Sequence, residues 1–472
     1  MTDRTARAIS PGDMIALPPP LRLAAAVLLA LPAAAAERPA DLPEVPFERF
    51  VLPNGLRVIL HVDHAAPIAA VHVEYDVGSK DEQPGRTGFA HLFEHLMFQG
   101  SQNLPKGEAD RLLEAAGGQG NGSTSHDSTV YWQQAPVNAL EQLVFSESDR
   151  MGFLLPTLTQ EKLDNQREVV RNERRQNYEM QPYGLAYDRL FAALWNPEFP
   201  YHWMPIGSHE DLQAATLEDV KGWFSRWYGP ENAVLAIAGD IDRARTRALV
   251  EQWFGSIPGG LRAESPRPEP RPLDGEKRVV LEDRVQLPRL YMAWQTPALY
   301  APGDAALDVL AQVLSSGKSA RLQKRLVMDE RIAQGVSAGQ SSLSLASAFV
   351  VVATPKPGID LARLERTIDE ELARLAATPP TPVELERAKN KIEAGAVFGL
   401  EQVSGRAAML AAYELRAGDP GFLARDLARY RAVTAKDVQE AARTFLRKDR
   451  RVVLTVVPRK GEPAAPAAGG AR

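Results

Sequence analysis

The sequence predicts an α+β protein that is built from two related halves. Three observations lead to this prediction. Stretches with the alternating pattern of strands are mixed with stretches of helical periodicity in both halves, which is typical of sheets covered by helices. The ends of the two halves repeat each other at a constant offset of 218 residues. A segment rich in proline separates them, and such segments favour an extended linker.

Residues 1–36 are predicted to be a cleaved signal peptide. Three arginines precede an apolar run over residues 23–31, and three alanines at 34–36 supply a small-residue cleavage site. The run is too short for a stable membrane span, so we expect no span after cleavage. These features predict an exported, periplasmic protein whose synthesis starts at Met1 or Met14. The alternative is a leader rich in alanine and proline on a cytosolic protein.

The composition is that of an ordinary globular protein with room for at least two domains. The chain has 472 residues, of which 44% are hydrophobic and 24% are charged. A formal net charge of −5 and the lack of a basic patch with interleaved aromatic residues argue against nucleic acid as a partner. The sequence has no cysteine, so any metal site must rely on histidine and carboxylate.

Two strands and a helix are predicted near the start of the first half. The strands cover residues 57–60 and 70–75, where apolar and β-branched side chains dominate. The helix follows Thr87, a candidate N-cap, and carries an apolar stripe at helical spacing. Gly100 is the expected stop signal. This order places the polar residues of the helix beside a sheet.

His91 and His95 lie one helical turn apart, so both imidazoles project from the same face of the predicted helix. At this spacing two histidines can share one tetrahedral zinc ion. Glu94 directly precedes the second histidine, where its carboxylate could take a proton from a water on the metal. The residue order is the inverse of the commoner H-E-x-x-H motif. The alternative is a helix whose histidines pack or cap and bind no metal.

A catalytic zinc site needs a third protein ligand, and a second helix offers two candidates. This helix is predicted to begin after Thr159, with Leu163 and Val170 on its inward face. Glu173 follows three residues after Val170 on the same face, whereas Glu168 is rotated by about 200° from Val170. Because a carboxylate on an apolar face is costly unless paired or metal-bound, Glu173 is the predicted ligand. Glu168 is predicted to be solvated or to support the ligands from outside; alternatively, both are surface charges.

The domain boundaries follow from the linker and from the repeat. Five prolines mark a linker over residues 258–275, between a zinc-bearing domain at 45–257 and a related domain at 276–459. Residues 460–472 are rich in alanine, glycine and proline and are predicted to be a disordered tail.

Each of these domains ends with a capped helix followed by a strand. Thr216 and Thr434 are the predicted N-caps, and the strands cover residues 234–238 and 452–456. A constant offset across a helix and a strand indicates an internal duplication. The alternative is two unrelated helix–strand endings, since caps of this type are common.

The two polar stretches together resemble the pitrilysin/insulinase family of inverted-motif zinc metallopeptidases. The first stretch is His91-Leu92-Phe93-Glu94-His95 and the second is Arg167–Arg175. The likeness covers nearly all of the chain beyond residue 45, and the length is similar to the short subunits of the processing-peptidase branch. Flanking residues match as well: Gly78-Ser79, Gly100-Ser101, Gly117-Gly118, Asn121 and Thr124.

The resemblance implies a fold, a cofactor and a site. The fold would be two homologous α+β domains, each a mostly antiparallel sheet covered by helices, which together form half of a clamshell chamber. One zinc ion per chain would be held by His91, His95 and Glu173, with Glu94 as general base. The activity would be that of a zinc endopeptidase.

The resemblance also implies a place for the peptide substrate. In the family an extended peptide adds as a strand to a sheet edge beside the metal, and residues 120–124 resemble that edge. Asn121, Gly122 and Ser123 are therefore the expected substrate-binding residues. Gly122 stands where the family usually has alanine, which would make the edge more flexible. The alternative is that residues 117–122 are a flexible surface loop.

One departure from the family concerns its partners. Fully active members carry an arginine and a tyrosine seven residues apart, whereas this chain has Val327 and Gln334 at those places. Neither side chain can replace the missing groups, and the helical phase disfavours Arg325 or Arg331 as substitutes. Four such domains close the family's chamber and this chain provides two. We therefore expect a heterodimer with a metal-free sister subunit that supplies the pair.

Three classes of function follow. The first is a zinc endopeptidase acting on extended peptides or unfolded segments. The second is a non-catalytic structural or assembly subunit of the same fold, which normally lacks the metal ligands. The third is a periplasmic zinc- or peptide-binding protein, which would not need Glu94 beside the second histidine.

Overall fold

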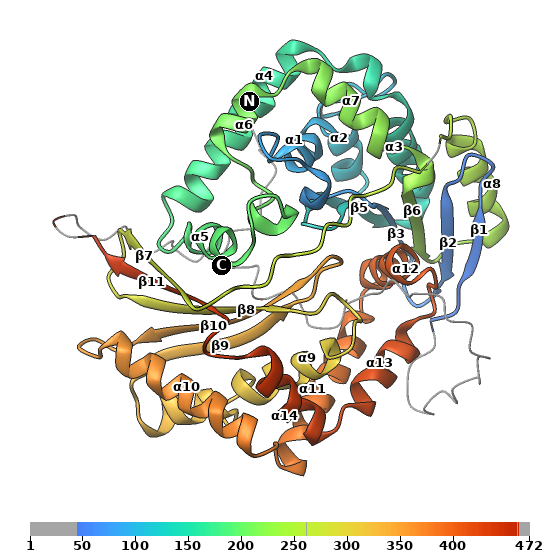
Figure 1. Cartoon of the computed structure of the whole chain (residues 1–472). Coiled ribbons are helices and arrows are strands. Elements are labelled where there is room, and N and C mark those ends of the chain that lie inside the picture. Colours follow the sequence, from blue (N-terminus) through green and yellow to red (C-terminus); the bar gives the residue numbers. More distant parts are fainter. Residues whose placement is uncertain (1–44, 261, 460, 462–472) are drawn as a thin grey trace.

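The structure is a computed structural model that describes residues 45–260, 262–459 and 461 (Figure 1). The predicted signal peptide and almost all of the predicted tail lie outside these residues. Two sheets form the centre of the molecule, and each is covered by its own set of helices (Figure 1). Within the described residues, no helix combines the length and the apolar character needed to cross a bilayer.

The first half of the chain forms a six-stranded sheet in the order β1-β2-β6-β3-β5-β4. All neighbours are antiparallel except β2 and β6, which run parallel. Strand β4 lies at one edge. The strands are β1 (Glu48–Val51), β2 (Arg57–Val62), β3 (Ile68–Tyr75), β4 (Gln119–Thr124), β5 (Thr129–Pro136) and β6 (Ala233–Gly239).

Helices of the first half pack mainly on one face of this sheet and enclose a large apolar core. They are α1 (Phe89–Leu96), α2 (Glu108–Ala115), α3 (Leu140–Phe153), α4 (Gln160–Arg174), α5 (Ala186–Leu194), α6 (His209–Ala214), α7 (Leu217–Trp227) and α8 (Arg243–Phe254). A π-helical turn, Arg175–Glu179, directly continues α4.

The second half forms a five-stranded sheet in the order β7-β11-β8-β10-β9, again with one parallel pair, β7 and β11. Its strands are β7 (Lys277–Asp283), β8 (Arg289–Thr296), β9 (Ala333–Ser341), β10 (Ser347–Pro355) and β11 (Val452–Pro458). Its helices are α9 (Asp304–Ser315), α10 (Leu361–Ala377), α11 (Pro382–Gly399), α12 (Val403–Ala417), α13 (Leu423–Ala432) and α14 (Ala435–Phe445).

The two sheets have the same topology. Read from the parallel pair to the opposite edge, β2-β6-β3-β5-β4 in the first sheet corresponds to β7-β11-β8-β10-β9 in the second. Among the strands of the described residues, β1 alone has no counterpart in the second sheet. The fold class is thus confirmed as α+β with two related, mostly antiparallel sheets covered by helices.

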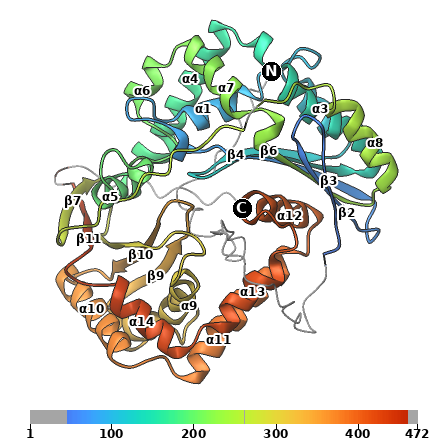
Figure 2. The same cartoon turned by 45° about the vertical axis from the view of Figure 1, so that its right-hand side comes forward.

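The halves also exchange one helix each. Helix α12 of the second half packs on β3 and β6 of the first sheet, and Figure 2 shows it beneath that sheet. Helix α5 of the first half packs on β7, β8 and β11 of the second sheet. Each sheet is therefore covered on one face by helices of its own half and on the other by a helix of the other half.

Three of the predicted helix starts are confirmed. The hydroxyls of Thr159, Thr216 and Thr434 accept backbone N–H groups at the N-termini of α4, α7 and α14. The prediction that Thr87 is the N-cap of α1 is wrong. The helix begins after Gly88, whose φ of 86° is left-handed. The Thr87 hydroxyl instead donates to Asp211 at 2.5 Å, which ties the start of α1 to α6. Helix α1 also ends earlier than predicted, at Leu96.

Candidate metal centre and active site

Helix α1 carries the histidine motif and is buried along its whole length. Its first turn is held by Glu82, whose carboxylate accepts the backbone N–H groups of Gly88 (3.0 Å) and Ala90 (2.9 Å). The indole N–H of Trp203 donates to the same carboxylate at 3.0 Å. These bonds satisfy two N–H groups at the helix N-terminus that have no partner within the helix, so Glu82 fixes the end of the helix that carries His91.

His91, His95 and Glu173 come together where α4 packs on α1. Their candidate donor atoms all lie within 4.8 Å of one another. Nε2 of His91 is 3.7 Å from Oε1 of Glu173, and Nε2 of His95 is 3.2 Å from Oε2. The two imidazole rings stand almost perpendicular, with centroids 4.8 Å apart. The helical phase that selected Glu173 in the sequence therefore brings its carboxylate to both histidines.

This donor set fits a zinc ion. Ligands bound at 2.0–2.2 Å in a tetrahedron lie about 3.3 Å from each other, close to the separations between the glutamate and the two histidines. Two imidazoles and one carboxylate also leave a fourth position open, as catalytic zinc sites require. Glu94, the predicted general base, lies on the same helix and is equally buried.

Burial dominates the electrostatics of the site. It lowers the pKa of His91 to about 4, so this imidazole is neutral and able to donate its lone pair near pH 7. It raises the pKa of Glu94 to about 7, which suits a group that takes and returns a proton. Burial also opposes ionisation of Glu173, but its contacts with His95 and His91 hold its pKa below the usual value.

Strand β4 lies directly beside the Glu94 carboxylate. The hydroxyl of Thr124, the last residue of the strand, donates to Oε2 of Glu94 at 2.6 Å. Gly122 is packed so closely that an added Cβ would lie 3.1 Å from Cγ of Glu94 and 3.1 Å from Phe98. An alanine at this position would require the side chain of Glu94 or Phe98 to move by a few tenths of an ångström.

Residues 119–124 form a strand, and not the flexible loop considered as the alternative. Asn121, Gly122 and Ser123 pair with β5 on one side only, because β4 is the edge of the sheet. The Asn121 side chain accepts the N–H of Gly122 at 2.9 Å.

Two polar contacts of the ligands were not anticipated from the sequence. Gln166, which is only 4% exposed, hydrogen-bonds to His95, and Asn177 hydrogen-bonds to Glu173. Gln166 lies three residues after Leu163 on the inward face of α4, so the phase that selected Glu173 also selects it. Asn177 lies in the π-helical turn, a local irregularity often found at functional sites.

Glu168 does not join the site. Its side chain is 54% exposed and pairs with Arg171 on the same helix at 2.6 Å. Of the two roles predicted for Glu168, the structure agrees with a solvated carboxylate. Gln166, on the same helix, lies beside the ligand His95 instead.

Val327 and Gln334, which stand at the places of the family's arginine–tyrosine pair, belong to the second half of the chain. Val327 is in a π-helical turn, Gln323–Asp329, and packs against the core of the second half. Gln334 is exposed on β9. Arg325, considered as a substitute, is held by Glu330 and Glu370.

Comparison with known protein families gives two matches. A model described as "Insulinase (Peptidase family M16)" matches residues 57–199, and one described as "Peptidase M16 inactive domain" matches residues 214–392. Among curated proteins, the zinc protease PqqE of Helicobacter pylori is 32% identical over 370 residues, which are 78% of this chain and 83% of that protein.

Solved structures agree on the fold. A protease from Helicobacter pylori has a TM-score of 0.81 and 30% identity, and the match covers 88% of this chain and all of that one. The periplasmic protease PqqL from Escherichia coli has a TM-score of 0.73 at 19% identity. In that case 90% of this chain matches only 50% of the other. The PqqL chain is thus about twice as long as the fold seen here.

Proposed function

Because this chain belongs to the insulinase family of peptidases (M16), we propose that it is a zinc-dependent endopeptidase that cleaves extended peptides or unfolded segments. One observation supports this above the others. Three donor atoms from His91, His95 and Glu173 lie within reach of one ion, and the Glu94 carboxylate lies on the same helix beside an exposed strand edge. A site that only stored metal would not need that carboxylate.

When bound, zinc would lower the pKa of a coordinated water and polarise the scissile carbonyl group. Glu94 would accept a proton from the attacking water on one carboxylate oxygen and deliver it to the leaving amine nitrogen. Thr124, which donates to Oε2, would keep that carboxylate directed toward the site. Gln166 and Asn177 would hold His95 and Glu173 in the orientation that the donor set requires.

The peptide would bind by adding a strand to β4. The outer edge of β4 pairs with no other strand in the described part of the chain, and the base lies beside it. Backbone pairing through Asn121, Gly122 and Ser123 would give affinity with little dependence on side chains. Extended or unfolded segments are therefore the substrate class that we propose.

We further propose that the active particle is a heterodimer in the periplasm. The second half offers no arginine–tyrosine pair at Val327 and Gln334, and a PqqL chain is about twice as long as this fold. A sister subunit would supply the pair and close the chamber. The leader at residues 1–36 supports export. Cleavage should be measured with the purified chain alone and with a candidate sister; full activity alone would overturn the heterodimer.

The decisive experiment makes the same substitution at two glutamates, Glu94 and Glu168. Glu94→Gln should lower kcat by about 10²- to 10⁴-fold, the range for losing a general base, while metal analysis still finds one zinc per chain. Glu168→Gln, the control, removes an exposed carboxylate and should leave kcat within about twofold. Each variant is assayed on an unfolded protein substrate in the preparation that shows activity.

Three results would contradict the proposal. The wild-type chain could fail to bind zinc stoichiometrically, its cleavage could resist a chelator, or Glu94→Gln could retain full turnover. A non-catalytic assembly subunit would show no zinc-dependent cleavage in any preparation, and a zinc-binding protein would keep its metal and be indifferent to Glu94→Gln.

A further inference from the structure

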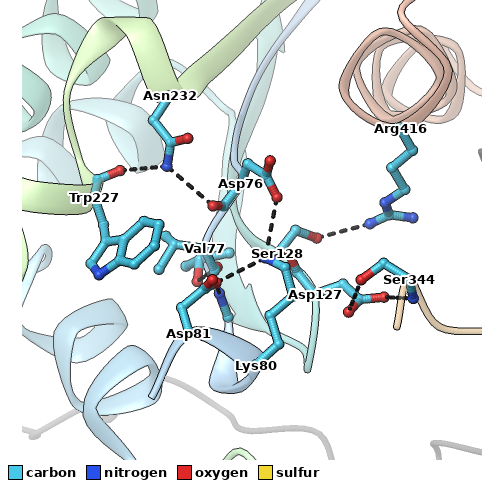
Figure 3. A network of polar contacts seen from close by, with 12 residues as sticks. Asp76, Val77, Lys80, Asp81, Asp127, Ser128, Trp227, Asn232, Ser344 and Arg416 are labelled. Atoms are coloured by element: carbon cyan, nitrogen blue, oxygen red, sulfur yellow. Dashed lines mark hydrogen bonds and ion pairs between the residues drawn. The ribbon is translucent and has the colours of Figure 1, made fainter. Parts of the chain in front are cut away.

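The two equivalent hairpins of the molecule meet at their tips. The turn between β4 and β5, residues 125–128, contacts the turn between β9 and β10, residues 342–346. The Asp127 carboxylate accepts both the backbone N–H and the hydroxyl of Ser344, each at 2.8 Å (Figure 3). Tyr201 joins the same contact, since its hydroxyl donates to Asp127 at 2.6 Å and accepts the N–H of Leu345 at 3.1 Å.

A second contact from the other half reaches the same turn. Arg416, on the exchanged helix α12, donates to the Ser128 hydroxyl at 2.9 Å (Figure 3). The same guanidinium nitrogen donates to Glu74 at 2.9 Å. Glu74 is 2% exposed and Ser128 is 3% exposed, so both acceptors are buried. The four-residue turn is thus held by two separate elements of the second half.

This turn leads directly to the proposed site by two routes. Strand β4 precedes it, and Thr124, one residue before the turn, donates to Glu94. The backbone of the turn also accepts the N–H groups of Ser79 (3.2 Å) and Lys80 (2.8 Å). That segment continues to Glu82, which caps helix α1.

The turn and residues 78–82, the segment before α1, approach each other closely. An added Cβ at Gly78 would lie 2.4 Å from the carbonyl oxygen of His126, so only glycine permits this approach. The buried ammonium group of Lys80 donates to the carbonyl of Asp127 at 3.0 Å and to Asp81 at 2.8 Å (Figure 3). Hydrogen bonds and a close backbone approach therefore join the turn to the segment before α1.

We propose that Asp127 and Ser128 are positioning residues through which the second half fixes the substrate-binding edge strand and the base Glu94. The inference rests on the proposed function and extends it to the half of the chain that carries no metal donors. Strand β4 needs such an anchor, because it pairs on one side only and contains Gly120 and Gly122, which add no stiffness. The hairpin turn sets the register of the edge that a peptide would meet.

The test compares two variants on the same exchanged helix. Arg416→Gln removes the contacts with Ser128 and Glu74. Glu414→Gln, the matched control, removes another contact between the halves, in which Arg49 of β1 donates two 2.8 Å bonds to Glu414. Hydrogen exchange of the amides of residues 119–128 is measured for both variants, together with kcat and KM on an extended peptide.

Arg416→Gln should speed exchange in residues 119–128 by about tenfold and raise KM by about tenfold, with zinc content unchanged. Glu414→Gln should leave both within about twofold. A merely structural role would lower the folded fraction, and hence the apparent kcat, without raising KM. Equal effects of the two variants, or unchanged exchange in Arg416→Gln, would overturn the inference.

If Arg416→Gln does not fold, a second pair of variants with smaller changes tests the same inference. Ser344→Ala removes one bond to Asp127, whereas Ser342→Ala removes a bond to Asp304 within the second half. Only Ser344→Ala should speed exchange in residues 119–128; no difference between the two would overturn the inference. If the wild-type chain shows no zinc-dependent cleavage, the proposed function fails, and exchange still decides whether the second half holds the turn.

Discussion

Helix α1 of the first half and helix α9 of the second half occupy equivalent places behind related sheets. Both begin after a glycine in the left-handed conformation, Gly88 and Gly303. Helix α4 packs on α1, as α11 packs on α9. The side chains differ. The third, sixth and seventh residues after the glycine are His91, Glu94 and His95 in α1, and Ala306, Val309 and Leu310 in α9.

The difference shows what the candidate metal centre costs the fold in stability. The second half fills these positions with buried apolar side chains, which stabilise the core directly. The first half buries three polar groups there, and burying polar groups opposes folding unless they find partners. The same backbone thus carries buried apolar side chains in one half and the candidate site residues in the other.

The largest expected effect comes from making the first half resemble the second. His95→Leu introduces the residue that α9 carries at the same place, Leu310. Zinc binding should be lost, and peptide cleavage should fall by about 10³-fold or more, because the remaining two donors cannot hold a catalytic ion. Metal analysis and initial rates check this expectation.

The control for this variant is His64→Leu, the same change at a histidine whose side chain is 69% exposed. It should keep one zinc per chain and nearly full activity. A His95→Leu protein that retained stoichiometric zinc would show that the two halves do not differ in the way proposed here.

A second expected effect concerns the pH dependence of stability without metal. Burial raises the pKa of Glu94 to about 7, so the folded chain holds this proton more tightly than the unfolded chain does. The resulting stability is complete below about pH 4.5 and is lost as the pH rises through about 7. Val309, its counterpart in the second half, has no such dependence.

Glu94→Gln should remove this loss. In the presence of a chelator, we compare the free energy of unfolding of the two proteins. Between pH 4.5 and 7.5, the difference between the variant and the wild type should shift in favour of the variant by up to about 3 kcal/mol. Burial lowers the pKa of His91 to about 4 and produces the opposite slope below pH 6.5, in both proteins alike. Urea unfolding at a series of pH values measures the difference; parallel curves for the two proteins would contradict it.

The smallest expected effect compares the two equivalent edge strands, β4 and β9. A Cβ added at Gly122 would lie 3.1 Å from Cγ of Glu94, whereas a Cβ added at Gly339 would meet no atom within 4 Å. Gly122→Ala should displace the base and lower kcat/KM by about tenfold. Gly339→Ala should leave kcat/KM within about twofold. Equal rates for the two variants would mean that β4 yields without moving Glu94.

Local patterns in the sequence predicted much of the fold and which residues lie together at the candidate site. The caps at Thr159, Thr216 and Thr434 depend on neighbouring residues, and the phase that selected Glu173 depends only on helix geometry. Thr87 failed as a cap because its partner, Asp211, lies far away in the chain and draws the hydroxyl away from the helix.

Contacts between distant segments could not be predicted in this way. Gln166 was available from the phase argument, but its role depends on the orientation of His95. The capping of α1 by Glu82 and the meeting of Asp127 with Ser344 require the folded arrangement of both halves.

The exchange of α5 and α12 has a consequence for how the chain can be divided. A fragment cut at the proline-rich segment would leave the first sheet without α12, and its partner fragment would lack α5. Each piece would expose an apolar surface that is buried in the intact chain. On the first sheet this surface includes Ala70, Val234 and Ala236. The two fragments are therefore expected to aggregate when they are expressed separately and to become soluble only when they are co-expressed.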